Sequence, residues 1–317
     1  MDLVDTAARP NVAFLFAGQG SQRPGMGHAL YEASPAARAV LDAVEEVRPG
    51  TREQCFSGTK EELSLTANTQ PCVFAVDLAC ACALRERGIV SAAVAGHSLG
   101  EVAALAFAGA FDVACATRLV SERARLMTAC CEEHPGAMRA VLKLDAATVE
   151  ALSAKAGEAW PVNYNSPLQT VVAGSPAACE RLDALVREAR GRSMAVAVSG
   201  AFHSPYMAAA TEGLAAYLAA NPPQAPAVTC WANLTGAPYA GTPEEISKTL
   251  CAQASNPVRW VDELCGLKAA GIDTFVEVGP GHTLTGLVRR TLEDVTTYNV
   301  ETPDQLEEVV RALGKDA

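Results

Sequence analysis

The sequence predicts an α/β protein in which a smaller unit is inserted into a larger α/β domain. The chain has 317 residues, half of them hydrophobic and 19% charged, which is typical of a globular protein with a sizeable core. Its first apolar run ends in a glycine loop and is followed by helical segments, as in α/β folds. Between positions 137 and 199 the pattern changes to six short elements, which indicates a second lobe.

Apolar runs and glycine or proline breaks define the elements of the larger part. The segment "TQPCVFAVDLACACALRERG" is a mostly buried helix that stops at Gly88, and Gly96 ends the next apolar run. The predicted strands are 12–16, 89–95, 228–233 and 274–278, and the predicted helices are 69–88, 99–108 and 303–314. Ser98 therefore lies on a turn from a strand to a helix.

The six elements of the inserted part alternate in a recognisable order. They are the strand "AMRAVLKL", the helix "AATVEALSAKAG", the strands "WPVNYN" and "QTVVAG", the helix "SPAACERLDALVREARG" and the strand "SMAVAVS". The order βαββαβ is that of the split βαβ, or ferredoxin-like, unit. We therefore expect two lobes with a cleft between them.

Composition narrows the classes of partner and compartment. A net charge of −11 argues against nucleic acid or an anionic membrane as the main partner, since both need clustered Lys and Arg. The eleven cysteines are scattered without a histidine cluster, which favours buried free thiols and no metal site. The N-terminus lacks the features of a secretory signal, and we see no run of the ~18–20 apolar residues that span a bilayer. We expect a cytoplasmic protein.

The pentapeptide "GHSLG" is the most informative motif. A G-x-S-x-G turn bends sharply, so that the serine hydroxyl stands clear of the backbone at the head of a helix, where developing negative charge is favoured. The strand before Ser98 and the helix after it are the context that the motif requires. Ser98 is therefore a candidate nucleophile, and the alternative is a tight turn in which Ser98 caps the helix.

A serine nucleophile needs a base, and the chain has five histidines. His97 is a weak candidate, because consecutive side chains diverge on a sharp turn. His203, in "SGAFHSPYM", follows the last strand of the inserted unit and lies where the lobes should meet, and clefts between lobes commonly hold sites. His282 is better explained as a cap of the helix that begins near it.

Arg123 lies on the apolar stripe of the helix that contains "RLVSERARLM", because its neighbours three and four positions away are apolar. A charge on a buried stripe needs a partner. That partner is either a carboxylate of the protein or a substrate carboxylate held by the guanidinium fork. The loop "GQGSQ" lacks the spacing of a nucleotide-binding loop, and the backbone N–H of Gln19 is instead placed to bind an oxyanion.

These motifs together resemble the malonyl-CoA:acyl carrier protein transacylases and the related discrete acyltransferases of polyketide synthases. The resemblance covers nearly the whole chain through "FAGQGSQ", "TQP", "GHSLGE", "ERARLM", "NYNSPLQTVVAG", "GAFHS", "SNPVRW" and "EVGPGHTLTGL". It implies an α/β-hydrolase-like catalytic domain, residues 1–132 and 202–317, with an inserted ferredoxin-like small domain, residues 133–201. We also expect a monomer that binds no cofactor, while the sequence leaves the oligomeric state open.

The resemblance further implies roles for individual residues. Ser98 would carry the acyl group, His203 would be its base, and Arg123 would bind the malonyl carboxylate. The backbone N–H groups of Gln19 and Leu99 would form the oxyanion hole, and the backbone carbonyl of Gln253 would orient the histidine. The side chains that would line the pocket are Gln70, Asn165 and Phe202. Arg192 would contact the phosphate of CoA or of the carrier.

The expected reaction is transfer of malonyl from malonyl-CoA to the phosphopantetheine thiol of a holo acyl carrier protein through a malonyl-serine intermediate. "GAFH" matches the form associated with malonyl selectivity, since Phe202 would crowd a C2 methyl group. An acidic carrier needs a basic patch, for which the candidates are Arg190, Arg192, Arg289 and Arg290. The pathway, fatty acid or polyketide synthesis, is left open.

Two other functions are compatible with the serine motif. An editing hydrolase of the same fold would release acyl groups to water, but relatives of that kind lack the arginine that Arg123 matches. A carrier-protein docking module without activity would not need Ser98, His203 and Arg123 together.

Overall fold

The computed structural model describes residues 11–198 and 200–314. A six-stranded sheet forms its centre, with strand order β10-β9-β1-β2-β7-β8. All neighbouring strands are parallel except the β7–β8 pair. The bounds are β1 Val12–Phe16, β2 Ala93–Gly96, β7 Thr229–Ala232, β8 Ala237–Pro238, β9 Thr274–Val278 and β10 Thr296–Val300.

Helices cover both faces of this sheet, which is why the strand β1 is apolar at every position. On β1, Phe14 and Phe16 pack into one core and Ala13 and Leu15 into the other. The second core is made with α12 (Trp260–Ala269) and α13 (Thr283–Thr291). The first and larger core is made with α1 (His28–Ala33), α2 (Pro35–Val47), α3 (Thr51–Ser57), α4 (Lys60–Ser64), α5 (Thr66–Glu86), α6 (Gly100–Phe107), α7 (Val113–Glu133), α10 (Ala208–Ala220), α11 (Pro243–Gln253) and α14 (Pro303–Leu313).

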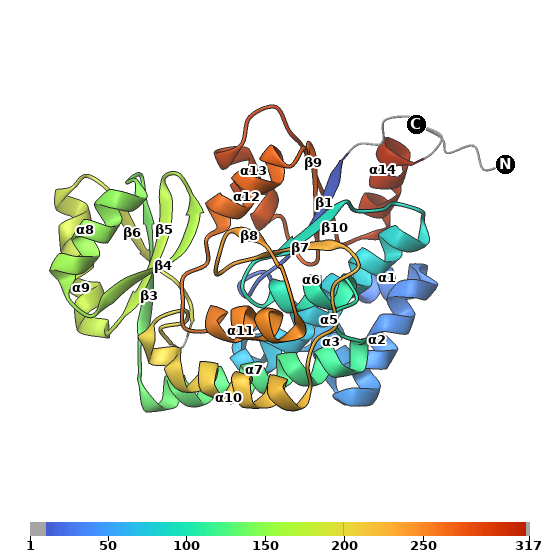
Figure 1. The fold of residues 1–317 in the computed structure, drawn as a ribbon, viewed down its shortest axis with the longest axis horizontal. Coiled ribbons are helices and arrows are strands. Elements are labelled where there is room, and N and C mark those ends of the chain that lie inside the picture. Colours follow the sequence, from blue (N-terminus) through green and yellow to red (C-terminus); the bar gives the residue numbers. More distant parts are fainter. Residues whose placement is uncertain (1–10, 199, 315–317) are drawn as a thin grey trace.

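The helix α5 corrects one expectation from the sequence. It is long and apolar enough to cross a membrane by length and composition, although we saw no run of that kind. In the structure 89% of its most apolar window is buried inside the protein. The helix contacts α2, α6 and α7, so its apolar surface forms the centre of the larger core (Figure 1).

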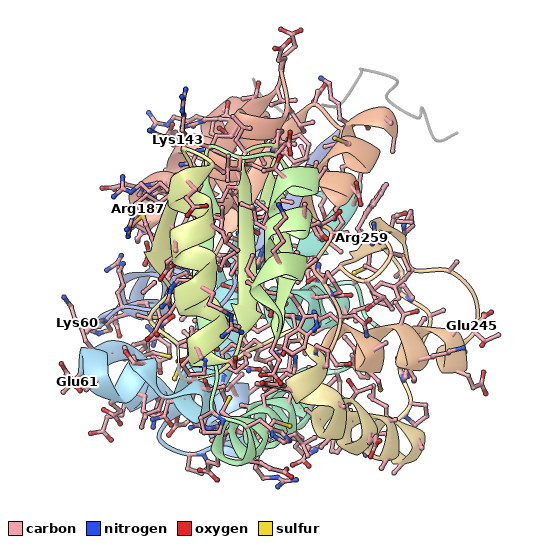
Figure 2. The ribbon with its side chains drawn as sticks, turned by 90° about the vertical axis from the view of Figure 1, so that its left-hand side faces the viewer. Lys60, Glu61, Lys143, Arg187, Glu245 and Arg259 are labelled. Atoms are coloured by element: carbon pink, nitrogen blue, oxygen red, sulfur yellow. The ribbon has the colours of Figure 1, made fainter. Side chains whose placement is uncertain are left out.

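The inserted part forms a separate four-stranded antiparallel sheet with the order β4-β5-β3-β6. Its elements are β3 (Ala137–Leu142), α8 (Ala146–Ala156), β4 (Ala159–Ser166), β5 (Gln169–Gly174), α9 (Pro176–Glu188) and β6 (Arg192–Ala195). The unit projects to the left of the large sheet in Figure 1. Figure 2 shows α8 and α9 side by side on its outer face, with Lys143 and Arg187 at its margin.

The inner face of the small sheet packs against the larger part. Met138, Val162 and Val171 share a core with Met127 of α7 and with Phe202. The last strand is shorter than predicted: β6 ends at Ala195, because the Val198 N–H turns back to the Val196 carbonyl at 2.9 Å. The final residue of the predicted strand, Ser199, lies outside the described residues. A bridge between Pro135 and Gly200 brings the two ends of the insertion together.

Candidate active site

Ser98 lies on the tight turn between β2 and α6 with a φ of 57°, in the left-handed region that L residues rarely adopt. The two flanking glycines make the turn possible. A Cβ on Gly100 would lie 2.3 Å from the Phe16 carbonyl oxygen, and a Cβ on Gly96 would lie 2.0 Å from the Gly100 carbonyl carbon. The turn is therefore packed against β1, and Ser98 is presented at the carboxyl end of the parallel strands.

His203 completes a hydrogen-bonded pair with Ser98. The Ser98 Oγ and the His203 Nε2 are 2.7 Å apart, and His203 also has a positive φ, 61°. The His203 Nδ1 lies 2.8 Å from the Gln253 carbonyl oxygen. Because a carbonyl only accepts, Nδ1 carries the proton and Nε2 is free to accept the hydroxyl proton of Ser98. Burial, and then the charge of Arg123, lower the pKa of His203 to about 3, which keeps the imidazole neutral.

Arg123 of α7 is 2% exposed and lies beside this pair. Its Nη1 donates to the Gln70 Oε1 at 2.6 Å, and its Nη2 donates to the Gln253 Oε1 at 2.9 Å and to the Ser98 Oγ at 3.3 Å. Burial lowers the pKa of Arg123 to about 10, so the group remains cationic at neutral pH. Among the described residues no protein carboxylate forms a salt bridge with it.

A cavity of about 260 Å³ opens at Ser98 and is lined by both parts of the chain. Of the residues expected at the site, it is lined by Gln19, Gln70, Ser98, Asn165, Phe202 and His203. The small sheet adds Met138, Ala140, Asn163, Gln169 and Val171. The cavity therefore lies in the cleft between the lobes, where the sequence predicted a site.

The backbone amides of Gln19 and Leu99 have no hydrogen-bond acceptor in the described part of the chain. Within residues 11–198 and 200–314 neither N–H donates to a protein acceptor, whereas the Ser98 N–H donates to the Asn233 Oδ1 at 2.7 Å and the Gly100 N–H donates to the His97 carbonyl at 3.1 Å. Unpaired amides next to a nucleophile are the donors that an oxyanion hole requires.

His97 and Asn165 connect the two lobes beside Ser98. The His97 Nε2 is 2.8 Å from the Asn165 Oδ1, and the imidazole packs edge-on against Trp260 with ring centroids 5.4 Å apart. Burial lowers the pKa of His97. The ring thus contacts β4 of the small sheet, in agreement with the expectation that it diverges from the Ser98 hydroxyl.

Four polar residues behind the turn were not found from the sequence. Asn233 directly follows β7, Glu101 lies in the first turn of α6, Tyr239 follows β8, and Glu263 lies on α12. Asn233 donates to the Gly96 carbonyl at 2.7 Å and to Glu263 at 2.8 Å while it accepts from the Ser98 N–H. Two of the four had a signal in the sequence that could have been used: Glu101 directly follows "GHSLG", and Asn233 ends the predicted strand "VTCWAN".

The basic residues proposed for phosphate or carrier contacts are separated. Arg190, Arg192, Arg289 and Arg290 are exposed, and Arg192 begins β6 four residues before the cavity-lining Val196, a distance of about 13 Å along an extended chain. Arg290 of α13 instead donates to Gln169 at 3.0 Å, and Gln169 lines the cavity. The structure thus brings Arg290 to the cavity rim.

The capping role expected for His282 is wrong. His282 occupies the residue before α13, but its side chain makes no capping hydrogen bond. The carboxylate of Glu277 accepts from the N–H groups of Leu284 and Thr285 at 3.0 and 2.7 Å and satisfies the start of the helix. In the part of the chain that the structure describes, no group of three or more His, Cys, Asp or Glu side chains is arranged to hold a metal.

A serine on the turn after a parallel strand, paired with a histidine and lying beside a buried guanidinium, is typical of serine enzymes that transfer acyl groups. The acyl transferase domain model matches residues 13–313. The malonyl CoA-acyl carrier protein transacylase of Bacillus subtilis (strain 168) is 35% identical over 96% of this chain and 98% of its own. The chain therefore belongs to the acyl transferase family, and it is an acyltransferase.

Solved structures agree with this assignment. An acyl-carrier-protein S-malonyltransferase from Burkholderia pseudomallei 1710b is 34% identical, with a TM-score of 0.91 over 95% of this chain and 99% of that one. A malonyl transacylase in complex with its type II polyketide synthase acyl carrier protein is 31% identical, with a TM-score of 0.92 over 95% and 99% of the two chains.

Proposed function

We propose that this enzyme transfers the malonyl group of malonyl-CoA to the phosphopantetheine thiol of a holo acyl carrier protein. The observation that carries the proposal is the buried Arg123 guanidinium, which lies 3.3 Å from the Ser98 Oγ and has no carboxylate partner in the described part of the chain. The malonyl transacylases of the comparison, one of them in complex with its carrier protein, support the same substrate and acceptor.

In the first step His203 Nε2 takes the proton of Ser98 as Oγ attacks the thioester carbonyl. The backbone N–H groups of Gln19 and Leu99 would hold the tetrahedral oxyanion, each such donor being worth roughly 3–4 kcal/mol. The C–S bond then breaks, His203 returns the proton to sulfur, and CoA leaves as the thiol. Ser98 is left as a malonyl ester.

In the second step the carrier thiol attacks this ester, and His203 takes the thiol proton. Collapse of the second tetrahedral intermediate breaks the C–Oγ bond, and the proton returns to Ser98. One serine and one base thus serve two transfers in sequence, which predicts ping-pong kinetics.

Acyl selectivity would come from Phe202, which lines the cavity, and from Arg123, which lies behind the cavity wall within 3.3 Å of the Ser98 Oγ. Arg123 offers a fork of donors that suits a carboxylate, as its bonds to Gln70 and Gln253 already show for amide oxygens. Phe202 lines the cavity and is packed against the small-sheet core, so it would crowd a substituent at C2 of the malonyl group. We assign Asn165 and Gln70 to the pocket wall.

Phosphate and carrier contacts would use exposed basic residues at the cleft. Arg290 is supported by its contact with the cavity residue Gln169, and Arg192 stays a more distant candidate on β6. The net charge of −11 makes such a local patch necessary for an acidic carrier protein.

We also propose a description of the architecture. The strand order β4-β5-β3-β6 and the βαββαβ order support a ferredoxin-like domain of residues 133–201, and the turn at Ser98 supports an α/β-hydrolase-like domain of residues 1–132 and 202–317. A monomeric cytoplasmic enzyme that needs no bound cofactor is part of the same proposal.

Intact-mass analysis tests the function directly. Wild-type protein mixed briefly with malonyl-CoA should gain one malonyl group, Ser98→Ala should gain none, and the adduct should move to holo carrier protein when this is added. An adduct that is lost to water and never reaches the carrier would instead show a hydrolase. If no acyl-CoA labels Ser98, the protein is not an acyltransferase of this kind.

A further inference from the structure

A buried polar network lies behind Ser98, on the side away from the cavity. Its members are Asn233, Gln253, Glu101 and Glu263, all buried, and the half-buried Tyr239. None of the five lines the cavity. Any effect of these residues on the reaction would therefore pass through the site residues that they contact.

Gln253 is the junction between this network and the site. Its Nε2 donates to the Glu101 Oε2 at 2.6 Å and to the Ser98 carbonyl at 2.7 Å, and its Oε1 accepts from Arg123 Nη2 at 2.9 Å. The amide dipole thus points its oxygen at the cation and its nitrogen at the carboxylate. This chain of hydrogen bonds joins Arg123 to Glu101 without direct contact, and each bond polarises the next.

Glu101 is surrounded by donors that suit its ionised form. The Tyr239 hydroxyl donates to Oε1, and Gln253 donates to Oε2. Burial raises the pKa of Glu101 to about 7, while the bonds from Tyr239 and Gln253 and the charge of Arg123 lower it. The charged or titratable groups that face Glu101 are Tyr239 after β8, Cys230 on β7, Glu263 on α12 and Arg123 on α7.

Glu263 provides a contrast within the same network. It is also fully buried, but its Oε1 accepts only from Asn233 Nδ2 and its Oε2 has no partner among the described residues. Burial, and then the charge of Glu101, raise its pKa well above the usual range, which favours the neutral form of Glu263. Of the two acids, Glu101 alone contacts Gln253.

We infer that Glu101 is a positioning residue that acts through Gln253: its carboxylate fixes the Gln253 amide, which directs the Arg123 guanidinium toward the acyl group on Ser98. The inference rests on the proposed function, since the direction of Arg123 matters for an acyl group that carries a carboxylate. It adds to that function a carboxylate, Glu101, that fixes the orientation of the Arg123 guanidinium before substrate binds.

The first experiment compares two isosteric substitutions, Glu101→Gln and Glu263→Gln. With malonyl-CoA, Glu101→Gln should lower kcat/KM by about tenfold or more, the size expected for losing a hydrogen bond to a charged group. Phenylmethanesulfonyl fluoride, which has no carboxylate, should still modify Ser98 at nearly the wild-type rate. Glu263→Gln should change neither rate.

The outcomes separate positioning from a structural role. The inference is overturned if Glu101→Gln matches wild type with malonyl-CoA. It is also overturned if the rates of Glu101→Gln with malonyl-CoA and with phenylmethanesulfonyl fluoride fall by the same factor. If wild-type protein forms no malonyl adduct, the proposed function fails and the inference fails with it. If wild-type protein forms the adduct and Glu101→Gln is as active as wild type, the inference fails but the proposed function stands.

A pH profile gives a second readout that does not need the Glu101 variant to fold. Wild-type kcat/KM for malonyl-CoA should rise around pH 7 as Glu101 ionises. Tyr239→Phe removes a donor that lowers the pKa of Glu101, so the rise should move to higher pH and activity should recover there. An unshifted profile in Tyr239→Phe would overturn the inference. A folded Glu101→Gln should lack the rise.

Discussion

The imidazole of His203 is oriented by the main-chain oxygen of Gln253, which lies 2.8 Å from Nδ1. This acceptor is a neutral peptide group, and among the residues that the structure describes no carboxylate forms an ion pair with the imidazole. Arg123 lies nearby and lowers the pKa of His203 further. The histidine is therefore suited to brief protonation within each transfer step and returns readily to the neutral form.

We expect His203→Ala to slow acylation of Ser98 by malonyl-CoA by about 10²- to 10⁴-fold, the usual contribution of a general base. The reason is that the Ser98 hydroxyl then has no acceptor for its proton. Single-turnover mass measurements would give the rate. His282→Ala, which removes an exposed histidine without a capping bond, is the matched control and should keep the wild-type rate.

The pH dependence of the protein's stability should reflect the lowered pKa of His203. The folded pKa of His203, about 3, lies below its ordinary value of 6.5, so the unfolded chain binds more protons between these values. The stabilisation from keeping His203 neutral is complete above pH 6.5 and is lost as the pH falls toward 3. Wild-type Tm should therefore fall more on acidification from pH 7 to 5 than the Tm of His203→Gln, and parallel curves would contradict the assignment.

Arg123→Ala should reduce malonyl transfer far more than acetyl transfer, because only malonyl has a carboxylate for the guanidinium. Arg123→Lys keeps a charge but loses the fork of donors that now reaches both Gln70 and Gln253, so it should restore only part of the activity. Initial rates with the two acyl-CoA substrates measure both effects. Equal losses for malonyl and acetyl would show that Arg123 does not bind the carboxylate.

Local sequence patterns were sufficient for much of the site. The period of the apolar stripe on α7 predicted that Arg123 is buried, and the glycines around Ser98 predicted the strand-to-helix turn, because each depends on residues a few positions apart. The sequence of strands and helices in the small unit, βαββαβ, was also predicted from local patterns. Such features are encoded within single elements and are visible before any tertiary contact is known.

The network behind the turn depends on long-range contacts and was not predicted. Asn233 binds the Ser98 N–H from 135 positions away, and Gln253 binds Glu101 from 152 positions away. A polar residue at the end of a strand has many potential partners, and the sequence does not say which. The sheet order, which sets β2 beside β7, decides that Asn233 reaches Ser98.

The position of Asn233 leads to a prediction about stability. Asn233→Ala removes hydrogen bonds to the Ser98 N–H, the Gly96 carbonyl and Glu263, and leaves these buried groups without partners. We expect a loss of about 3 kcal/mol or more in the free energy of unfolding. Asn299→Ala loses one bond of 3.4 Å and should cost little by comparison. Urea unfolding of both variants tests this, and similar losses would show that Asn233 has no special role in the turn.

Phe202 provides the test of selectivity at C2 of the acyl group. Phe202 is 6% exposed and lines the cavity next to Ser98 and His203, so Phe202→Ala opens space on that side. The ratio of kcat/KM for methylmalonyl-CoA to that for malonyl-CoA should rise by about 10- to 200-fold, the range for one methyl group in an apolar pocket. Val171→Ala opens the cavity from β5 instead and should leave the ratio close to wild type. A rise of the same size in both variants would mean that cavity volume alone, and not the position of Phe202, sets the preference.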